Sequence, residues 1–343
     1  MKYLLDPSVF ALDANATKRE FNIFVNRILL WDKWFNDHPD DVYILSDTSS
    51  RLFEMGVFPV YDVFEALANK HDIRHVQPSN VNQIINRLLQ RSNEIDRYKG
   101  CRVDGDMALE EMLANGTKAG RDMQQLLWPL YCHCRMSGER MDTFIVIGKD
   151  FDRNVTLDVT YKTLAECKGE LVEKEQHDHV ELICVPSLPQ FFRTPGVARD
   201  ILVRSDEIDD LYLAVRVAVY QNGELEKVAD AYSKYPFTIQ RTFHRDYRNN
   251  HYLSKPGFLT SYIEAMSHSL LNKSLRHRED FRTGKGGDNP QMRHNAKDGV
   301  WLAWRWKVTE SVSFQYWRLD AKVRFANIGE HDYFCCSWEE QQS

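Results

Sequence analysis

Long apolar runs are absent from this chain of 343 residues. The longest, such as the stretch at 143–147, are far shorter than the roughly 20 residues that a membrane-spanning helix needs. The first residues, Met1 to Asp6, contain neither the apolar segment nor the small-residue cleavage site of a secretory signal. We therefore expect a protein with no membrane partner that works in the cytoplasm.

Cysteine is also scarce. The seven cysteines are an odd, scattered set, which favours reduced thiols in a reducing compartment over a disulfide framework. Cys132-His133-Cys134 lies in a stretch typical of a buried helix, and no second Cys/His pair stands at the spacing of a zinc finger. The sequence thus argues against a structural zinc site.

Charge is distributed unevenly along the chain. Residues 1–234 carry 28 Lys and Arg against 38 Asp and Glu, whereas residues 235–343 carry 16 against 12. Between residues 241 and 324 the balance is 16 against 8. Such a basic segment favours a polyanionic partner. The alternative is an ordinary solvated surface whose charge varies along the chain without a functional reason.

Short apolar strands alternate with amphipathic helices through the first half of the chain. We predict strands at 2–6, 42–45, 142–147, 156–161 and 180–185, and helices at 17–37, 48–54, 60–70, 80–94, 108–115 and 118–135. This alternation predicts an α/β domain over residues 1–190 with a mainly parallel sheet. A helical linker region is expected at 191–235.

The last fifty residues indicate a small antiparallel meander. From 300 to 308, apolar side chains alternate with Ala303, Arg305 and Lys307, which is the period of a half-buried strand. Two more strands are predicted at 312–319 and 322–334, with a turn at 329–332. We therefore predict an α+β domain over 236–343, whose small antiparallel sheet has an apolar face and a basic face.

Three segments give the first half a family resemblance. They are Met-Lys-Tyr-Leu-Leu-Asp-Pro-Ser-Val-Phe at 1–10, Arg-Asp-Met at 121–123 before a long helix, and Phe-Ile-Val-Ile-Gly-Lys-Asp-Phe at 144–151. Together they resemble a degenerate PIN-type nuclease domain. The resemblance implies that Asp6, Asp122 and Asp150 hold Mg²⁺ or Mn²⁺, which activates water against a phosphodiester.

Two positions depart from that family pattern. Arg51, followed by Leu52, stands where the family has a helix acid, and Gly148 stands where its last acid would precede Lys149. These departures favour a domain that scaffolds or binds over one that cuts. Asp6 and Asp122 then serve as carboxylates at a strand end and a helix start.

The meander carries a second resemblance. Gly-Val-Trp at 299–301, Phe-Gln-Tyr-Trp at 314–317 and Phe-Ala-Asn-Ile-Gly-Glu-His at 325–331 resemble strands of RelE-type toxins. That family packs helices on an antiparallel sheet and cuts RNA without a metal, commonly messenger RNA on the ribosome. Ser313 stands where many of these toxins carry an arginine.

This second resemblance implies a set of roles. His331 is the candidate general acid or base, Asp332 orients its ring, and Arg318 is the candidate catalytic cation. The candidates for phosphate contacts are Arg293, Arg305, Lys307, Lys322 and Arg324. Trp304 and Trp306 are expected in the core, while Trp301 and Trp317 remain candidates for stacking on bases.

The leading hypothesis is an RNA-acting toxin or anti-phage defence effector. It would be a metal-independent endoribonuclease without a cofactor, acting through its basic sheet on RNA or the ribosome. One alternative is a PIN-type nuclease that depends on Mg²⁺ or Mn²⁺. Others are a non-catalytic RNA- or ribosome-binding protein and a subunit that forms a complex with a protein partner or antitoxin.

Overall fold

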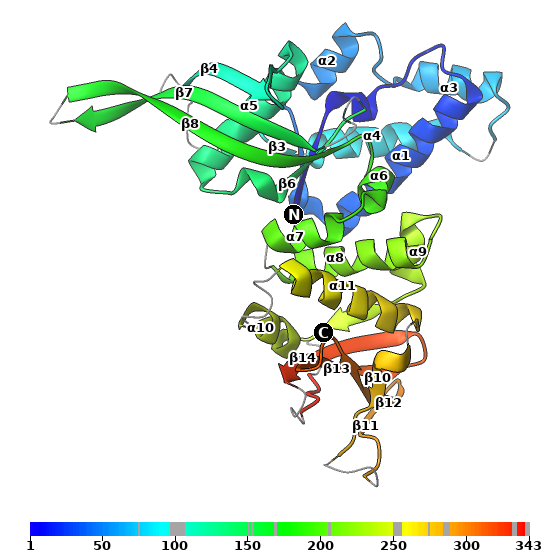
Figure 1. Ribbon diagram of the computed structural model, residues 1–343. Coiled ribbons are helices and arrows are strands. Elements are labelled where there is room, and N and C mark those ends of the chain that lie inside the picture. The colour runs from blue at the N-terminus through cyan, green and yellow to red at the C-terminus, as the bar shows by residue number, and fades with distance from the viewer. Residues whose placement is uncertain are drawn as a thin grey trace. The chain divides into compact units, whose positions relative to one another are not determined.

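The computed structural model describes residues 1–74, 76–96, 107–149, 151, 154–167, 170–204, 207–249, 256–273, 275–283, 289–330 and 335–339. The chain divides into two compact units, Met1–Leu188 and Pro189–Ser343, which we name unit 1 and unit 2 (Figure 1). Each unit combines helices with its own sheet. The predicted division into two α/β parts is confirmed in this coarse form.

Unit 1 is built on an eight-stranded mixed sheet with the order β3-β2-β1-β6-β8-β7-β4-β5. Its strands are β1 (Lys2–Leu5), β2 (Val42–Ile44), β3 (Asn93–Glu94), β4 (Met107–Ala114), β5 (Thr117–Lys118), β6 (Phe144–Ile147), β7 (Val155–Cys167) and β8 (Glu170–Val185). The pairs from β3 to β8 are parallel. Those from β8 to β5 are antiparallel, so the predicted parallel sheet is one half of a larger one.

Helices cover both faces of the parallel half. They are α1 (Lys18–Asp37), α2 (Thr48–Glu54), α3 (Tyr61–Lys70), α4 (Pro78–Arg91) and α5 (Arg121–Ser137), with short 3-10 turns η1 (Pro7–Phe10), η2 (Pro39–Asp41) and η3 (Met141–Thr143). On one face, Tyr3 of β1 contacts Trp31 and Trp34 of α1 edge-on. On the other face, Leu4 joins a buried core that includes Leu127 of α5.

Helix α1 shows how local sequence fixes an element. Thr17 and Glu20 form a capping box, in which the Thr17 N–H donates to the Glu20 carboxylate at 2.8 Å and the Glu20 N–H donates to Thr17 Oγ1 at 3.3 Å. This box satisfies backbone N–H groups that have no partner in the first turn. The helix ends before Pro39, which has no N–H to continue it.

The prediction of a helix at 108–115 was wrong. Met107–Ala114 is β4, paired along its length with β7. The segment is rich in Ala, Leu, Glu and Met, which favour helices, but the tertiary ladder overrides this preference. Strands β7 and β8 are also longer than predicted and form a hairpin that extends away from the helices of unit 1 (Figure 1).

Unit 2 contains a six-stranded sheet with the order β10-β12-β13-β14-β9, to which β11 adds by pairing with β12. Its strands are β9 (Phe237–Ile239), β10 (Arg278–Asp280), β11 (Arg293–Ala296), β12 (Gly299–Lys307), β13 (Val312–Leu319) and β14 (Lys322–Glu330). The predicted meander is confirmed as β12-β13-β14. Gly329 and Glu330 belong to β14 rather than to the predicted turn.

The helices of unit 2 begin at its boundary. They are α6 (Leu188–Arg193), α7 (Val197–Arg204), α8 (Ile208–Asn222), α9 (Val228–Ser233), α10 (Arg241–Asn249), α11 (Pro256–Leu271) and the 3-10 turn η5 (Leu275–His277). Helix α8 is buried along most of its length and packs against α7 and α11. The segment expected to be a linker at 191–235 therefore contributes to the interior of unit 2.

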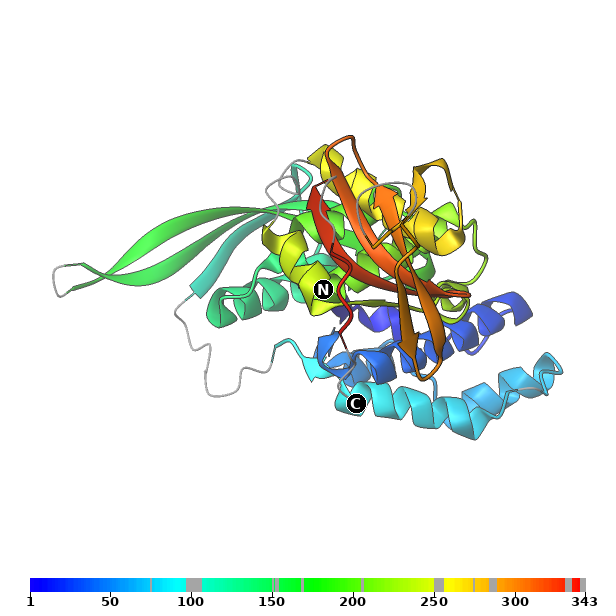
Figure 2. The ribbon, with the colours of Figure 1, turned by 90° about the horizontal axis from the view of Figure 1, so that it is seen from below.

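The sheet of unit 2 is covered on both faces, which we name the helix face and the second face. On the helix face, Phe314 and Phe325 contact Phe243 of α10. In Figure 2 the strands coloured orange to red lie in front of the yellow helices. A separate cluster on the second face buries Trp301 and Trp317, each only 2% exposed.

Of the four tryptophans in this sheet, three are almost fully buried. Trp301 and Trp317, the candidates for stacking on bases, are both packed in the cluster of the second face. The expectation of a core position is confirmed for Trp306, which is 2% exposed. Trp304 is half-buried, with the Arg278 guanidinium 4.3 Å from its ring centre.

A buried arginine, Arg216, connects several elements in the interior of unit 2. Arg216 of α8 donates to the carbonyls of Ala231 at 2.6 Å and Tyr235 at 2.7 Å, and its guanidinium lies 4.1 Å from the Phe237 ring centre. Burial lowers the pKa of Arg216 to about 10, so the group is still charged at neutral pH. Arg216 thus joins α8 and α9 to the chain that leads into β9.

We expect Arg216→Met to destabilise unit 2 by about 2–4 kcal/mol, because a buried and a partly buried carbonyl lose their charged donor. Urea unfolding followed by tryptophan fluorescence measures this, since five of the eight tryptophans lie in unit 2. Arg199→Met is the control, because Arg199 is exposed and donates only to Asp200 in the described contacts. Equal stability of the two variants would contradict the assignment.

Candidate functional site

The carboxyl edge of the parallel strands is the first candidate region. Strand order reverses between β1 and β6, and open α/β sheets bind ligands at such a switch point. Asp6 follows β1 directly, and its N–H donates to the carbonyl of Ile147 at 2.8 Å. The N–H of Lys149, just after β6, donates to Ser8 Oγ at 3.0 Å. The ends of β1 and β6 are therefore joined by hydrogen bonds.

Two of the three predicted metal ligands, Asp6 and Asp122, belong to the described residues. Asp6 accepts a hydrogen bond from the Ser8 N–H at 2.8 Å and caps η1. Asp122 lies exposed in the first turn of α5, and Asp150 lies outside the described residues. In the described part of the chain, no group of three or more His, Cys, Asp or Glu side chains could hold a metal ion.

Packing accounts for Gly148, the first departure from the nuclease pattern. A Cβ added at Gly148 would lie 2.7 Å from Asp6 Cβ and 3.1 Å from Phe151 Cδ2. Both distances are inside the roughly 3.5–4 Å of an ordinary carbon–carbon contact. The side chain of Asp6 therefore takes the space that an acid at position 148 would need.

Hydrogen bonds account for Arg51, the second departure. Its Nε donates to Asp47 Oδ2 at 2.8 Å, and one terminal nitrogen donates to Gln125 Oε1 of α5 at 3.1 Å. A guanidinium thus bridges α2 and α5 at the position where the resemblance implies a carboxylate. Sequence reasoning also missed Asp96, which accepts hydrogen bonds from the N–H and hydroxyl of Ser46 at 2.8 and 2.7 Å and so joins the ends of β2 and β3.

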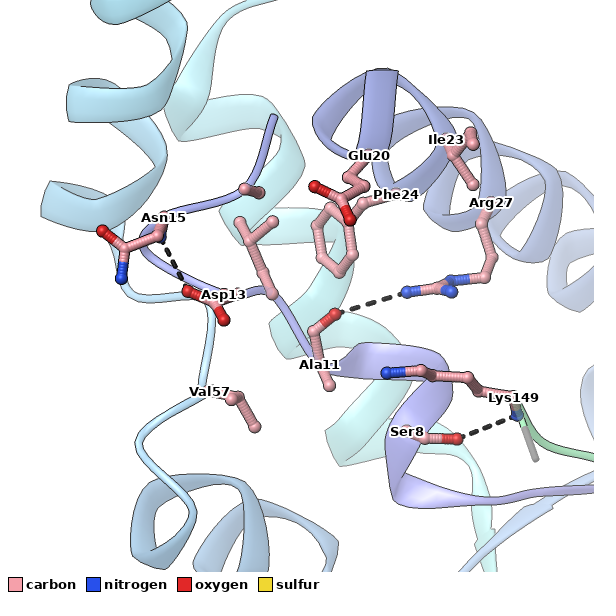
Figure 3. Close-up of a pocket in the computed structure, with 12 residues that line it drawn as sticks. Ser8, Ala11, Asp13, Asn15, Glu20, Ile23, Phe24, Arg27, Val57 and Lys149 are labelled. Atoms are coloured by element: carbon pink, nitrogen blue, oxygen red, sulfur yellow. Dashed lines mark hydrogen bonds between the residues drawn. The ribbon is translucent and has the colours of Figure 1, made fainter. Parts of the chain in front are cut away.

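A pocket of about 350 Å³ lies beside this edge, between η1, the start of α1 and the turn after β6 (Figure 3). Its polar lining residues are Ser8, Asp13, Asn15, Glu20, Arg27 and Lys149. None of them except Lys149 stood out in the sequence. An arginine in the middle of a long amphipathic helix carries no signal that distinguishes it from a solvated one.

On the sheet of unit 2, two predicted cations share one acid. Arg305 donates to Glu279 Oε2 at 2.7 Å, and Lys307 Nζ lies 2.5 Å from Glu279 Oε1. Burial alone would raise the pKa of Glu279, but the hydrogen bonds from Lys307 and Arg305 outweigh it and hold the pKa below its usual range. Both cations are thus largely neutralised within the unit.

The remaining predicted residues are scattered. Arg318 donates to the carbonyl of Ser269 in α11 at 2.7 Å, which places it on the helix face, and burial lowers its pKa. Lys322 pairs with Asp298 at 3.0 Å. Arg293 is exposed on β11. His331 and Asp332 follow β14 and lie outside the described residues.

The second face is covered by residues 335–339 of the same chain, which we name the C-terminal strap. The indole of Trp338 stacks on His294 of β11, with 3.8 Å between ring centres and 19° between planes. The Arg324 guanidinium lies 4.4 Å from the Trp338 ring centre. The described structure therefore places an aromatic ring against an imidazole and a guanidinium.

The C-terminal strap also caps the N-terminus of α10. The Glu339 carboxylate accepts hydrogen bonds from the N–H groups of Arg241 and Thr242, each at 2.9 Å. Burial alone would raise the pKa of Glu339, but the hydrogen bonds from Thr242 and Arg241 lower it overall. A phosphate can take the place of an anion at a helix N-terminus, and an unstacked base can take the place of a ring beside an imidazole and a guanidinium.

No family model, no curated protein and no solved structure matches this chain. Within the described residues, none of the helices has both the length and the apolar character needed to cross a bilayer. The function is therefore inferred from the residues and their geometry.

The close approach at Gly148 gives a direct test of the carboxyl edge. We expect Gly148→Ala to destabilise unit 1 by about 1–3 kcal/mol, because its new methyl group displaces the Asp6 side chain. Urea unfolding followed by circular dichroism measures this. Gly120→Ala is the control, since an added Cβ there meets nothing within 4 Å, and its effect should stay below about 1 kcal/mol. A tolerated alanine at 148 would mean that this edge has room for an acid.

Proposed function

We propose that this chain is an RNA-acting protein of the toxin or anti-phage defence type, which holds single-stranded RNA on the second face of the unit 2 sheet. The observation that supports this best is the setting of the C-terminal strap. Trp338 stacks on His294 and lies under Arg324, while Glu339 binds the N-terminus of α10. A base replaces the indole and a phosphate replaces the carboxylate in this proposal.

Exposed cations on α10 extend the same surface. Arg241, Arg245 and Arg248 are all exposed, and their spacing of four and three residues puts them on one side of the helix. Arg241 is also the residue at which Glu339 binds. A phosphate backbone bound at this N-terminus therefore meets further arginines along α10.

The proposed cleavage step needs no metal. His331 follows the last residue of β14, and Asp332 is next to it in the chain. His331 takes the proton of a 2′-hydroxyl as that oxygen attacks the adjacent phosphorus and the bond to the 5′-oxygen breaks. Water gives the leaving 5′-oxygen its proton, so the products are a 2′,3′-cyclic phosphate and a 5′-hydroxyl. Arg318 is left out of this step, because it is bonded to the Ser269 carbonyl on the helix face.

A second candidate, RNA binding without cleavage, is supported by that same placement of Arg318. Arg305 and Lys307 are also engaged, because both of them share Glu279. Here the strap face binds RNA or a ribosomal RNA element, and a protein partner or antitoxin acts by covering it.

If the strap occupies the RNA site, weakening its contacts should raise the affinity for RNA. We expect Glu339→Gln to tighten binding of a fluorescent single-stranded RNA by about 3–10-fold, because a weaker occupant is displaced more easily. Fluorescence anisotropy at fixed salt measures the Kd. Glu330→Gln removes the same charge from an exposed position at the end of β14 and should change the Kd less than twofold.

Two results would count against the displacement of the C-terminal strap by RNA. One is an equal gain in both glutamate variants, which would show a general charge effect. The other is an unchanged Kd in Arg324→Gln, because the guanidinium over the ring is proposed to contact the base.

A separate experiment tests cleavage. We expect the wild-type chain to cut RNA in EDTA and His331→Ala to lose about 100-fold or more of that rate, as removal of a general base does. Gel analysis of a labelled RNA follows both. Cutting that requires Mn²⁺ and is lost in Asp6→Asn would instead support the metal-dependent alternative. Retained RNA binding with no cutting under either condition would support the non-catalytic candidate.

A further inference from the structure

Arg27 of α1 is a largely buried cation whose charge has no counterion in the described structure. One terminal nitrogen donates to the carbonyl of Ala11 at 3.3 Å, and the guanidinium lies 5.4 Å from the Phe24 ring centre. Its Nε is buried and has no hydrogen-bond partner among the described residues. Burial lowers the pKa of Arg27 to about 10, so it is still charged at neutral pH.

This arrangement is unusual for a purely structural arginine. A guanidinium removed from water is normally paired with a carboxylate or saturated with acceptors, because an unpaired buried charge destabilises the fold. Arg216 of unit 2, with two carbonyl acceptors and an aromatic face, shows the saturated case. Arg27 has a donor without a described partner, and its side chain lines a pocket.

The pocket brings a second cation to Arg27. Lys149, from the turn after β6, lines the same cavity of about 350 Å³. Figure 3 shows the ends of both side chains directed toward the space beside Ala11. Two cations from different elements, one of them a planar fork, can bind two oxygens of one phosphate group.

The two acids of the pocket are engaged in local hydrogen bonds. The Glu20 carboxylate accepts from the N–H and hydroxyl of Thr17 at 2.8 and 2.7 Å, and Asp13 Oδ1 accepts from the Asn15 N–H at 2.7 Å. The charge of Lys149 also contributes to the lowered pKa of Glu20, after the two hydrogen bonds from Thr17. Lys149 is therefore partly balanced by Glu20, and Arg27 is the cation that a ligand would neutralise.

Polarity changes along the length of the pocket. Glu20 and Arg27 are seven residues apart on α1, which is about 10 Å along the helix axis. Between them lie Phe24 and the side chain of Ile23, which is 52% exposed. The cavity thus has a cationic end, an apolar wall and an end rich in acceptors. A nucleotide has the matching order of phosphate, ring faces and base donors, and the volume is within the range of small-molecule sites.

We propose that this pocket of unit 1 binds a nucleotide phosphate monoester, with the phosphate on Arg27 and Lys149 and the base toward Asp13 and Asn15. The site lies beside the switch point of the parallel sheet, where open α/β sheets bind their ligands. It is separate from the RNA-holding face proposed for unit 2 and uses none of its residues. The phosphate monoester is either a free mononucleotide or the 5′-phosphorylated end of an RNA.

Arg27→Met in the full chain is the deciding variant. We expect it to weaken AMP and UMP binding at least about 10-fold in isothermal titration, because the unpaired guanidinium holds the phosphate. The unliganded melting temperature should stay equal or rise, since removing an unpaired buried charge relieves the fold. Arg19→Met is the matched control, because Arg19 is an exposed arginine of the same helix outside the pocket lining, and it should change neither property.

Comparison of AMP with other ligands shows which chemical group the pocket recognises. Adenosine should bind far more weakly than AMP, and inorganic phosphate should bind more weakly than AMP because it gains nothing from the apolar wall. A 5′-phosphorylated oligoribonucleotide that outcompetes AMP identifies a chain end as the ligand, and the reverse order identifies a free nucleotide. Glu339→Gln should leave AMP binding unchanged, which separates this site from the strap face.

Three outcomes would overturn the proposal. The first is AMP binding in Arg27→Met equal to that of the wild type. The second is a lowered melting temperature in that variant with nucleotide affinity intact, which would assign Arg27 a structural role only. The third is a wild-type chain that binds neither AMP, UMP nor phosphate, or that binds phosphate as tightly as AMP.

Discussion

A guanidinium that leaves water must find acceptors or an aromatic face, and this constraint shapes both units. In unit 2, Arg216 ties α8 to the chain before β9, and Arg318 ties β13 to α11 through the Ser269 carbonyl. Arg324 lies over Trp338 and donates to the Glu339 carbonyl at 3.3 Å. Each acts as a clamp between segments far apart in the sequence. Arg27 has the sparsest set of these contacts, one carbonyl at 3.3 Å and a ring centre at 5.4 Å, and its Nε has no described partner.

The same constraint explains why the basic balance of residues 241–324 does not translate directly into a basic sheet face. Composition counts every cation equally, whereas the fold neutralises several of them. Glu279 forms ion pairs with Arg305 and Lys307, and Asp298 forms one with Lys322. The arginines of α10, which sequence periodicity alone did not single out, lie exposed on one side of that helix.

Sequence reasoning succeeded where the determining forces are local. The capping box at Thr17, the apolar spacing of α1 and the period-two pattern of β12 each fix an element from its own residues. It failed at Met107–Ala114, whose strand exists only because β7 pairs with it, and it could not show that the strap covers Trp301 and Trp317. It placed Asp6 at a strand end but could not show that its side chain fills the space beside Gly148. Strand order and cavities follow from contacts across the chain that no local pattern encodes.

The strap sets how RNA must compete for the second face. An occupant on the same chain acts at an effective concentration in the millimolar range for a short link, so a weak contact excludes ligands efficiently. RNA overcomes it by engaging several sites together, which the stacked ring position, the start of α10 and the outer arginines of that helix offer. A single nucleotide reaches only one or two of these sites and does not displace the strap. In our proposals the second face therefore selects for chains, whereas the pocket beside Arg27 selects for one phosphate group.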